Sequence, residues 1–150
     1  MVKKYVIVFD VGGTYFRFNV VNEDLELIEN ISENKIKSPN FQLYPDFSAD
    51  KLVSTLINKI ITTIDVIKKR NFDLNVVGIG ISFPGPVDFK GRVRSAPPLW
   101  GDIVKDYPLK KKLANILPYK VFILNDVSAC CWYYKNKFRD KRFCVITVST

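Results

Sequence analysis

The feature that most constrains the fold is a strand-like run near the start of the chain that is apolar on both faces. Val6, Ile7, Val8 and Phe9 are consecutive apolar residues, and Asp10 follows them directly. Such a run is typical of a strand in the middle of a sheet, because both of its faces are covered. A carboxylate held at the mouth of such a strand usually has a partner or a chemical role, because burial of an unpaired charge is unfavourable. Asp10 is therefore the first candidate site residue.

Two glycines, Gly12 and Gly13, separate this run from a second strand-like segment over residues 14–21. In that segment apolar and polar residues alternate with a period of two, as in a strand whose two faces differ. Two adjacent glycines between strands predict a β-hairpin with a tight primed turn, because glycine readily adopts positive φ angles. A hairpin accounts for the glycines but not for Asp10, which on a bare hairpin would only be solvated.

The rest of the chain reads as alternating helices and strands. Strands are predicted over residues 4–10, 14–21, 25–37, 74–82, 120–124 and 142–150, with a short hairpin around 89–94. The longest predicted helix follows Ser48, which is placed to cap it. The apolar stripe of this helix consists of Leu52, Val53, Leu56, Ile57, Ile60, Ile61 and Ile64. A second helix is expected between Pro108 and Pro118, with Leu109, Leu113 and Ile116 on its apolar face. This order predicts an α/β architecture with a mixed sheet covered by helices.

Composition limits the class of protein. The chain has 150 residues, 47% of them hydrophobic, which is enough for one domain with a core. The net charge of +8 is compatible with an anionic partner, but the basic residues are scattered over predicted helices. Solvated helix faces account for such cations, so we expect no nucleic-acid partner and no membrane association. No signal peptide or membrane span is recognisable, and a cytoplasmic protein is expected.

Cysteine and histidine usage narrows the chemistry further. The three cysteines, Cys130, Cys131 and Cys144, form neither a CxxC pair nor an even disulfide set, so buried, reduced thiols are expected. The chain contains no histidine. Any general base must therefore be a carboxylate, a lysine, a tyrosine or a cysteine.

Polar residues gather where the predicted strands end. Asp10, the loop after Ser82, the pair Asn125 and Asp126, and the final Ser149–Thr150 all follow such strands. In open α/β sheets ligands bind outside the carboxyl ends of the strands. Asp126 also begins a predicted helix, where Asp and Asn are favoured as caps in any case.

Four of these segments, taken in order, resemble the amino-terminal half of the ROK family of sugar kinases and repressors. They are DVGGT at 10–14, GIGISFPGPVD at 78–88, ND at 125–126 and ITVST at 146–150. The resemblance implies a ribonuclease H-like, actin-like ATPase lobe with three initial antiparallel strands. It also implies ATP and Mg²⁺ as cofactors and a hexose or amino sugar as substrate.

The first segment resembles the family's phosphate loop. Without side chains, Gly12 and Gly13 let backbone N–H groups approach phosphate oxygens, and the Thr14 hydroxyl adds a donor. The resemblance implies that Asp10 holds magnesium directly or through water, and that Arg17 offsets phosphate charge. Thr150 would belong to a second phosphate loop. No zinc site is expected in this chain.

The remaining segments resemble the family's sugar site. The resemblance makes Asp126 the catalytic base that accepts the proton of a sugar hydroxyl, while Asn125 suits two neighbouring hydroxyls. Gly85 and Ser95 are expected at the wall of the sugar pocket. Trp100 would either stack on the sugar or pack onto its own domain, as loop aromatics more often do. Where the family usually has small residues after the ND pair, this chain has the bulky residues Trp132, Tyr133 and Tyr134.

The chain ends at Thr150, so the family's carboxyl-terminal lobe with its adenosine site and zinc motif is expected to be absent. The resemblance thus implies that the chain is one lobe of a hexose kinase and that this lobe alone is nearly inactive. Whether the protein forms a homodimer stays open. Two alternatives remain: a sugar-responsive repressor, for which nine residues before Asp10 leave no room for a helix-turn-helix, and a lobe that binds sugar without chemistry.

Overall fold

The computed structural model describes residues 3–28, 35–70, 75–102, 104–139 and 141–147. Its centre is a five-stranded mixed sheet with the strand order β3-β2-β1-β4-β5. The strands are β1 (Lys4–Val11), β2 (Tyr15–Asn22), β3 (Lys35–Lys37), β4 (Asn75–Phe83) and β5 (Lys120–Asn125). β1, β2 and β3 pair antiparallel, whereas β1, β4 and β5 run parallel. The predicted architecture, including the three initial antiparallel strands, is confirmed.

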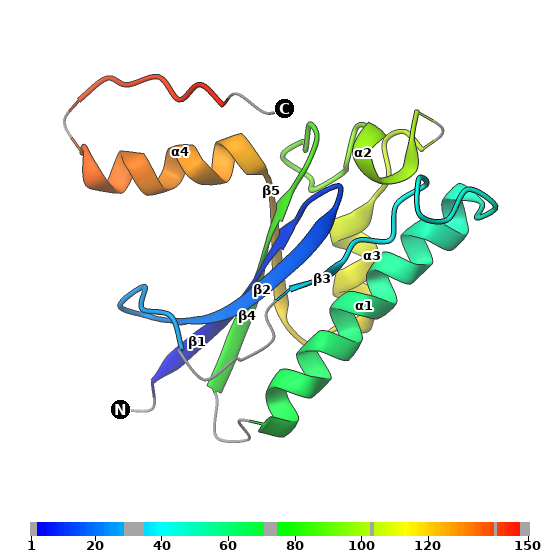
Figure 1. The fold of residues 1–150 in the computed structure, drawn as a ribbon. Coiled ribbons are helices and arrows are strands. Elements are labelled where there is room, and N and C mark those ends of the chain that lie inside the picture. Colours follow the sequence, from blue (N-terminus) through cyan, green and yellow to red (C-terminus); the bar gives the residue numbers. More distant parts are fainter. Residues whose placement is uncertain (1–2, 29–34, 71–74, 103, 140, 148–150) are drawn as a thin grey trace.

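Helices lie on both sides of this sheet (Figure 1). They are α1 (Ala49–Arg70), α2 (Pro97–Trp100), α3 (Leu109–Ile116) and α4 (Asp126–Lys137). α1 and α3 lie on one side and α4 on the other. None of the described helices is long and apolar enough to cross a bilayer.

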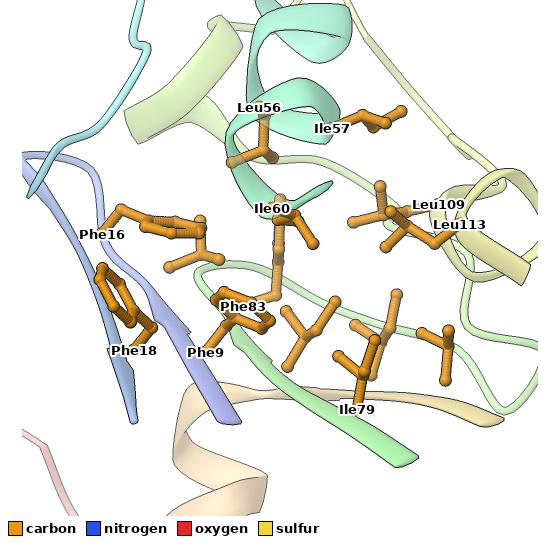
Figure 2. Close-up of a cluster of buried hydrophobic side chains, with 14 of the residues drawn as sticks. Phe9, Phe16, Phe18, Leu56, Ile57, Ile60, Ile79, Phe83, Leu109 and Leu113 are labelled. Atoms are coloured by element: carbon orange, nitrogen blue, oxygen red, sulfur yellow. The ribbon is translucent and has the colours of Figure 1, made fainter. Parts of the chain in front are cut away.

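The core lies between the sheet and the helices α1 and α3. Figure 2 shows Leu56 and Ile60 of α1 and Leu113 of α3 pointing toward Phe9 and Ile79 of the sheet. All five side chains are at most 2% exposed. Burial of each such side chain is worth about 1.5–3 kcal/mol, which makes this face the main source of stability. The apolar stripe predicted for α1 is confirmed, and Ser48 accepts a hydrogen bond from the N–H of Lys51, as predicted for the cap.

Three element predictions need correction. The strand predicted over 25–37 begins too early, because Asn22 folds the chain into a turn that is followed only by a bridge between Val21 and Leu27. Residues 29–34 of that prediction lie outside the described part. On α3, Leu117 is buried instead of Ile116, which is 55% exposed.

The predicted final strand is wrong over its described part, residues 142–147, which form neither helix nor strand. This segment runs along the side of α4 that faces away from the sheet (Figure 1). It therefore has no neighbouring strand with which to form the hydrogen bonds of a sheet. Residues 148–150 lie outside the described residues.

The cysteines are free, but their predicted burial is wrong. Cys130 and Cys144 are exposed and Cys131 is half-buried. Cys130 and Cys131 lie on α4, none of whose residues is buried, and Cys144 lies in the segment 141–147, which forms neither helix nor strand.

Candidate active site

Asp10 lies at the carboxyl end of the central strand β1, between two strands that supply its neighbours. Its register partners are Arg17 on β2 and Ser82 on β4. The Arg17 guanidinium donates to Oδ2 of Asp10 at 3.1 Å, and the Ser82 hydroxyl donates to Oδ1 at 3.3 Å. The side chains of Arg17 and Asp10 remain 55% and 51% exposed. Asp10 is thus held in place and still open to a ligand.

The loop after β1 is a hairpin, but not the primed turn predicted. Neither Gly12 nor Gly13 has a positive φ angle. Instead, the glycines allow close approach: a Cβ on Gly12 would lie 2.9 Å from the carbonyl oxygen of Tyr15, and one on Gly13 would lie 2.8 Å from Cβ of Pro98. The N–H of Gly12 donates to Tyr15 at 2.9 Å and is therefore used within the hairpin.

Asn125 and Asp126 lie at the junction between β5 and α4. The helix cap is Asn125, whose side chain accepts from the N–H of Ser128 at 3.2 Å. Its Nδ2 group donates to the carbonyl of Gly85 at 3.0 Å and to Oδ1 of Asp126 at 2.8 Å. Both side-chain N–H donors of Asn125 are thus used inside the chain, and its oxygen keeps one lone pair for a further donor.

Asp126 is exposed and occupies the first turn of α4. Its Oδ1 also accepts from the N–H of Val127 at 2.8 Å. Among the described residues, both hydrogen bonds to this carboxylate reach Oδ1, which fixes its orientation. Oδ2 has no hydrogen-bond partner among the described residues.

The loops after β4 form the rim of the site. Gly85 has a φ of +131°, and a Cβ there would lie 2.2 Å from the carbonyl oxygen of Ser95, so the two predicted sugar-wall residues are in contact. Trp100 does not line the rim: it is 2% exposed, with its ring 5.5 Å from that of Phe83 and 6.0 Å from that of Tyr107. The alternative that Trp100 packs onto its own domain is confirmed.

A charge network stiffens the hairpin beyond this rim. The Asp88 carboxylate accepts from the N–H groups of Arg92 and Lys90 and from the Arg92 guanidinium at 2.7 Å, and it lies 3.7 Å from Arg94. These interactions, with the N–H of Arg92 contributing most, hold the pKa of Asp88 below its usual value. Arg94 also pairs with Asp106.

The structure therefore brings most of the predicted site residues to one edge of the sheet. Thr14 is exposed in the loop between β1 and β2. Thr150 lies outside the described residues. The sequence analysis did not identify Ser82 as a site residue, although its position near the end of a strand parallel to β1 could have indicated it. It also missed Ser38 and Asn40, which contact residues 12–14, the glycine loop between β1 and β2.

The donor set fits a magnesium ion bound together with a phosphate. Asp10 offers hard carboxylate oxygens, and no cluster of three or more His, Cys, Asp or Glu residues occurs within the described ranges. Mg²⁺ typically keeps several waters and uses one or two carboxylates plus substrate phosphates instead of a full protein cage. Asp10 beside a glycine loop matches that preference.

Comparison with known proteins places this arrangement in a family. A glucokinase of the ROK family from Streptomyces griseus, solved with glucose and AMPPNP, shares 23% identity over 87% of this chain and 36% of its own, with a TM-score of 0.64. A ROK family transcriptional regulator, a homologue of the E. coli MLC protein, shares 20% identity over 89% of this chain and 30% of its own, with a TM-score of 0.71. The ROK hexokinase from Thermus thermophilus shares 22% identity over 88% of this chain and 38% of its own, with a TM-score of 0.61.

These likenesses show the fold, and the chain spans well under half the length of each of the three structures. No curated protein sequence matches the chain. The sequence model of the ROK family, however, matches residues 6–150, which is nearly the whole chain. The chain therefore belongs to the ROK family.

Proposed function

We propose that this chain is the amino-terminal lobe of an ATP-dependent hexose kinase, similar to glucokinases, that transfers the γ-phosphoryl group to a sugar hydroxyl. The observation that carries the proposal is the placement of two carboxylates. Asp10 is the second-last residue of β1 and Asp126 directly follows β5, and both strands run parallel to β4, which lies between them. Both carboxylates therefore lie at the same edge of the sheet.

Their separation suits phosphoryl transfer. Two strand spacings of about 4.8 Å place the backbones of β1 and β5 about 10 Å apart. A phosphoryl group beside Asp10 and a sugar hydroxyl beside Asp126 fit side by side in that space. Transfer needs the attacking and leaving oxygens roughly in line, and two groups on opposite sides of the gap are suited to hold them so.

Each residue then has a distinct task. Oδ2 of Asp126 accepts the proton of the sugar hydroxyl as the new O–P bond forms, because a neutral hydroxyl is a weak nucleophile. Asn125 keeps Asp126 oriented and offers its remaining lone pair to a neighbouring hydroxyl. Asp10 would hold Mg²⁺, which supplies charge neutralisation on the phosphates of ATP when bound, and Arg17 lies close enough to share that role.

A second lobe is part of this proposal. Phosphoryl transfer in such kinases relies on the closure of two lobes that excludes water, and the chain matches only 36–38% of the length of the kinases compared above. We propose that the adenosine site and further sugar contacts belong to a carboxyl-terminal lobe, and that the 150-residue chain alone has almost no turnover.

A sugar-binding regulator is the second candidate, because the regulator compared above fits this chain with a TM-score of 0.71. The two candidates differ in their need for a base. A regulator binds sugar without proton transfer, so the Asp126 carboxylate would serve it only as a hydrogen-bond acceptor.

The deciding experiment joins the chain to a ROK carboxyl-terminal lobe and measures ADP release with glucose, fructose, mannose and N-acetylated amino sugars. Asp126→Asn should lower the sugar-dependent rate by about 10²–10⁴-fold, the usual contribution of a general base. Asp65→Asn, an exposed carboxylate on α1, is the matched control and should leave the rate unchanged. An Asp126→Asn rate close to that of the unchanged protein would refute the role of Asp126, and sugar binding without ADP release would favour the regulator.

A further inference from the structure

Residues 38–40, which follow β3, donate hydrogen bonds to the glycine loop. The Ser38 hydroxyl donates to the carbonyl of Gly12 at 2.6 Å, and Nδ2 of Asn40 donates to the carbonyl of Gly13 at 2.6 Å. The N–H of Ser38 donates to the carbonyl of Thr14 at 3.0 Å. All three carbonyls of the loop thus accept hydrogen bonds from this one short segment.

The segment is itself firmly held. Ser38 is fully buried and Asn40 is 5% exposed. Oδ1 of Asn40 accepts from the N–H of Leu43 at 2.8 Å, and the N–H of Phe41 donates to the carbonyl of Leu99 on α2 at 2.9 Å. Because the side chains are buried, water cannot readily replace them, and their loss would leave the loop carbonyls unpaired.

This arrangement decides which way the loop N–H groups point. In a planar trans peptide the C=O and the following N–H point in opposite directions. The carbonyls of Gly12 and Gly13 point toward residues 38–40, so the N–H groups of Gly13 and Thr14 point away from that segment. Within the described ranges, those two N–H groups donate to no backbone carbonyl. Successive outward N–H groups are a typical binding site for a phosphate oxygen.

We propose that Ser38 and Asn40 are positioning residues that orient the glycine loop to bind a polyphosphate. The proposal rests on the proposed function only in its choice of ligand. Ser38 and Asn40 touch no substrate: Ser38 fixes the first peptide plane of the loop and Asn40 fixes the second. The resulting pair of N–H groups lies in the loop that follows β1, close to Asp10 in the chain. One phosphate chain could therefore contact the two N–H groups and approach Asp10 through a magnesium ion.

The test uses the ¹⁵N,¹³C-labelled 150-residue chain and magnesium tripolyphosphate as the probe. In the unchanged chain, the amide resonances of Gly13 and Thr14 should shift on titration. Ser38→Ala and Asn40→Ala should each weaken this binding by about five- to tenfold, the effect of losing one buried hydrogen bond to the loop. Ile64→Val, a core variant on α1 of comparable stability cost, is the control and should bind as the unchanged chain does.

A ligand-free signature separates positioning from general loss of structure. The carbonyl ¹³C resonance of Gly12 should move in Ser38→Ala, and that of Gly13 should move in Asn40→Ala, with neither moving in Ile64→Val. Because each variant removes a different bond, either one that folds tests the proposal, and Ser38→Thr should restore binding by keeping the hydroxyl.

Each outcome has a separate meaning. Unchanged tripolyphosphate affinity in a folded Ser38→Ala or Asn40→Ala variant would overturn the positioning role and leave the proposed kinase function intact. Absence of any shift at Gly13 and Thr14 in the unchanged chain would overturn polyphosphate binding by this loop, and with it both this inference and the phosphate part of the proposed function.

Discussion

Gly85→Ala tests the strictest geometric requirement of the site rim. Gly85 has a φ of +131°, and an added Cβ would lie 2.2 Å from the carbonyl oxygen of Ser95. The backbone conformation alone costs a non-glycine residue about 1–3 kcal/mol. Moving backbone atoms to remove the overlap costs about 1–3 kcal/mol more, as in other overpacked sites. We therefore expect Gly85→Ala to lower the free energy of unfolding by about 2–6 kcal/mol.

The matched control is Gly101→Ala. Gly101 also has a positive φ, +63°, but no neighbouring atom lies within 4 Å of the position of an added Cβ. Its replacement should cost only the backbone term of about 1–3 kcal/mol. Urea unfolding followed by circular dichroism gives both values, provided that the dependence on urea concentration is the same for all chains. Equal losses in the two variants would refute the argument that the contact with Ser95 requires glycine.

A second readout follows from the hydrogen bond between Gly85 and Asn125. The carbonyl of Gly85 accepts from Nδ2 of Asn125 at 3.0 Å, and the same amide group donates to Asp126. Displacement of Gly85 should therefore shift the side-chain amide resonances of Asn125. Gly101→Ala should leave those resonances in place.

Three further predictions concern the charge network, the core and the salt bridge beside the glycine loop. Asp88 has a pKa below its usual value in the folded chain. Its ionised form therefore stabilises the fold above the unfolded-state pKa of about 3.9, and this contribution is lost as the pH falls through the folded-state pKa. Asp88→Asn should consequently lose less stability than the unchanged chain between pH 5 and pH 3 in urea titrations, and an equal loss would contradict the network. Leu113→Ala should cost about 2–5 kcal/mol because the residue is fully buried, whereas Ile116→Ala, at a 55% exposed position, should cost far less; similar losses in urea unfolding would contradict the assigned face of α3. Arg17→Ala should change stability by less than about 1 kcal/mol, since its pair with Asp10 is exposed, yet weaken tripolyphosphate binding more than Lys69→Ala does in the same titration.

The fold was predictable wherever local pattern and burial agree. The stripe of α1 repeats at helical spacing and Ser48 precedes it, so the helix and its start could both be found in the sequence. The run from Val6 to Phe9 is apolar on both faces, and β1 is indeed the central strand. The pattern failed for residues 142–147. A strand needs a neighbour to pair with, and this segment has none within the described sheet.

The placement of the candidate site residues was predictable, whereas their contacts were not. Asp10, Asn125 and Asp126 could be found because each lies where a strand ends. The sequence could not show that the N-cap of α4 is Asn125 and that Asp126 is the first residue of the helix, because both residue types are good caps. Ser38 and Asn40 look like ordinary loop residues beside a proline, and only the folded chain brings them to a loop that lies 26 and 27 residues earlier.

These contacts connect the glycine loop, through α2, with the part of the site that contains Gly85, Asn125 and Asp126. Residues 38–41 hold the glycine loop on one side and the carbonyl of Leu99 on the other, while Gly13 packs against Pro98 of the same helix. The segment just before α2 contains Ser95, which contacts Gly85, and Gly85 in turn binds Asn125. A series of direct contacts thus connects the glycine loop with Asp126. Because the polar groups along this series bind one another, the edge has its shape before any ligand arrives, and a ligand that binds there needs to lose little conformational entropy of the protein.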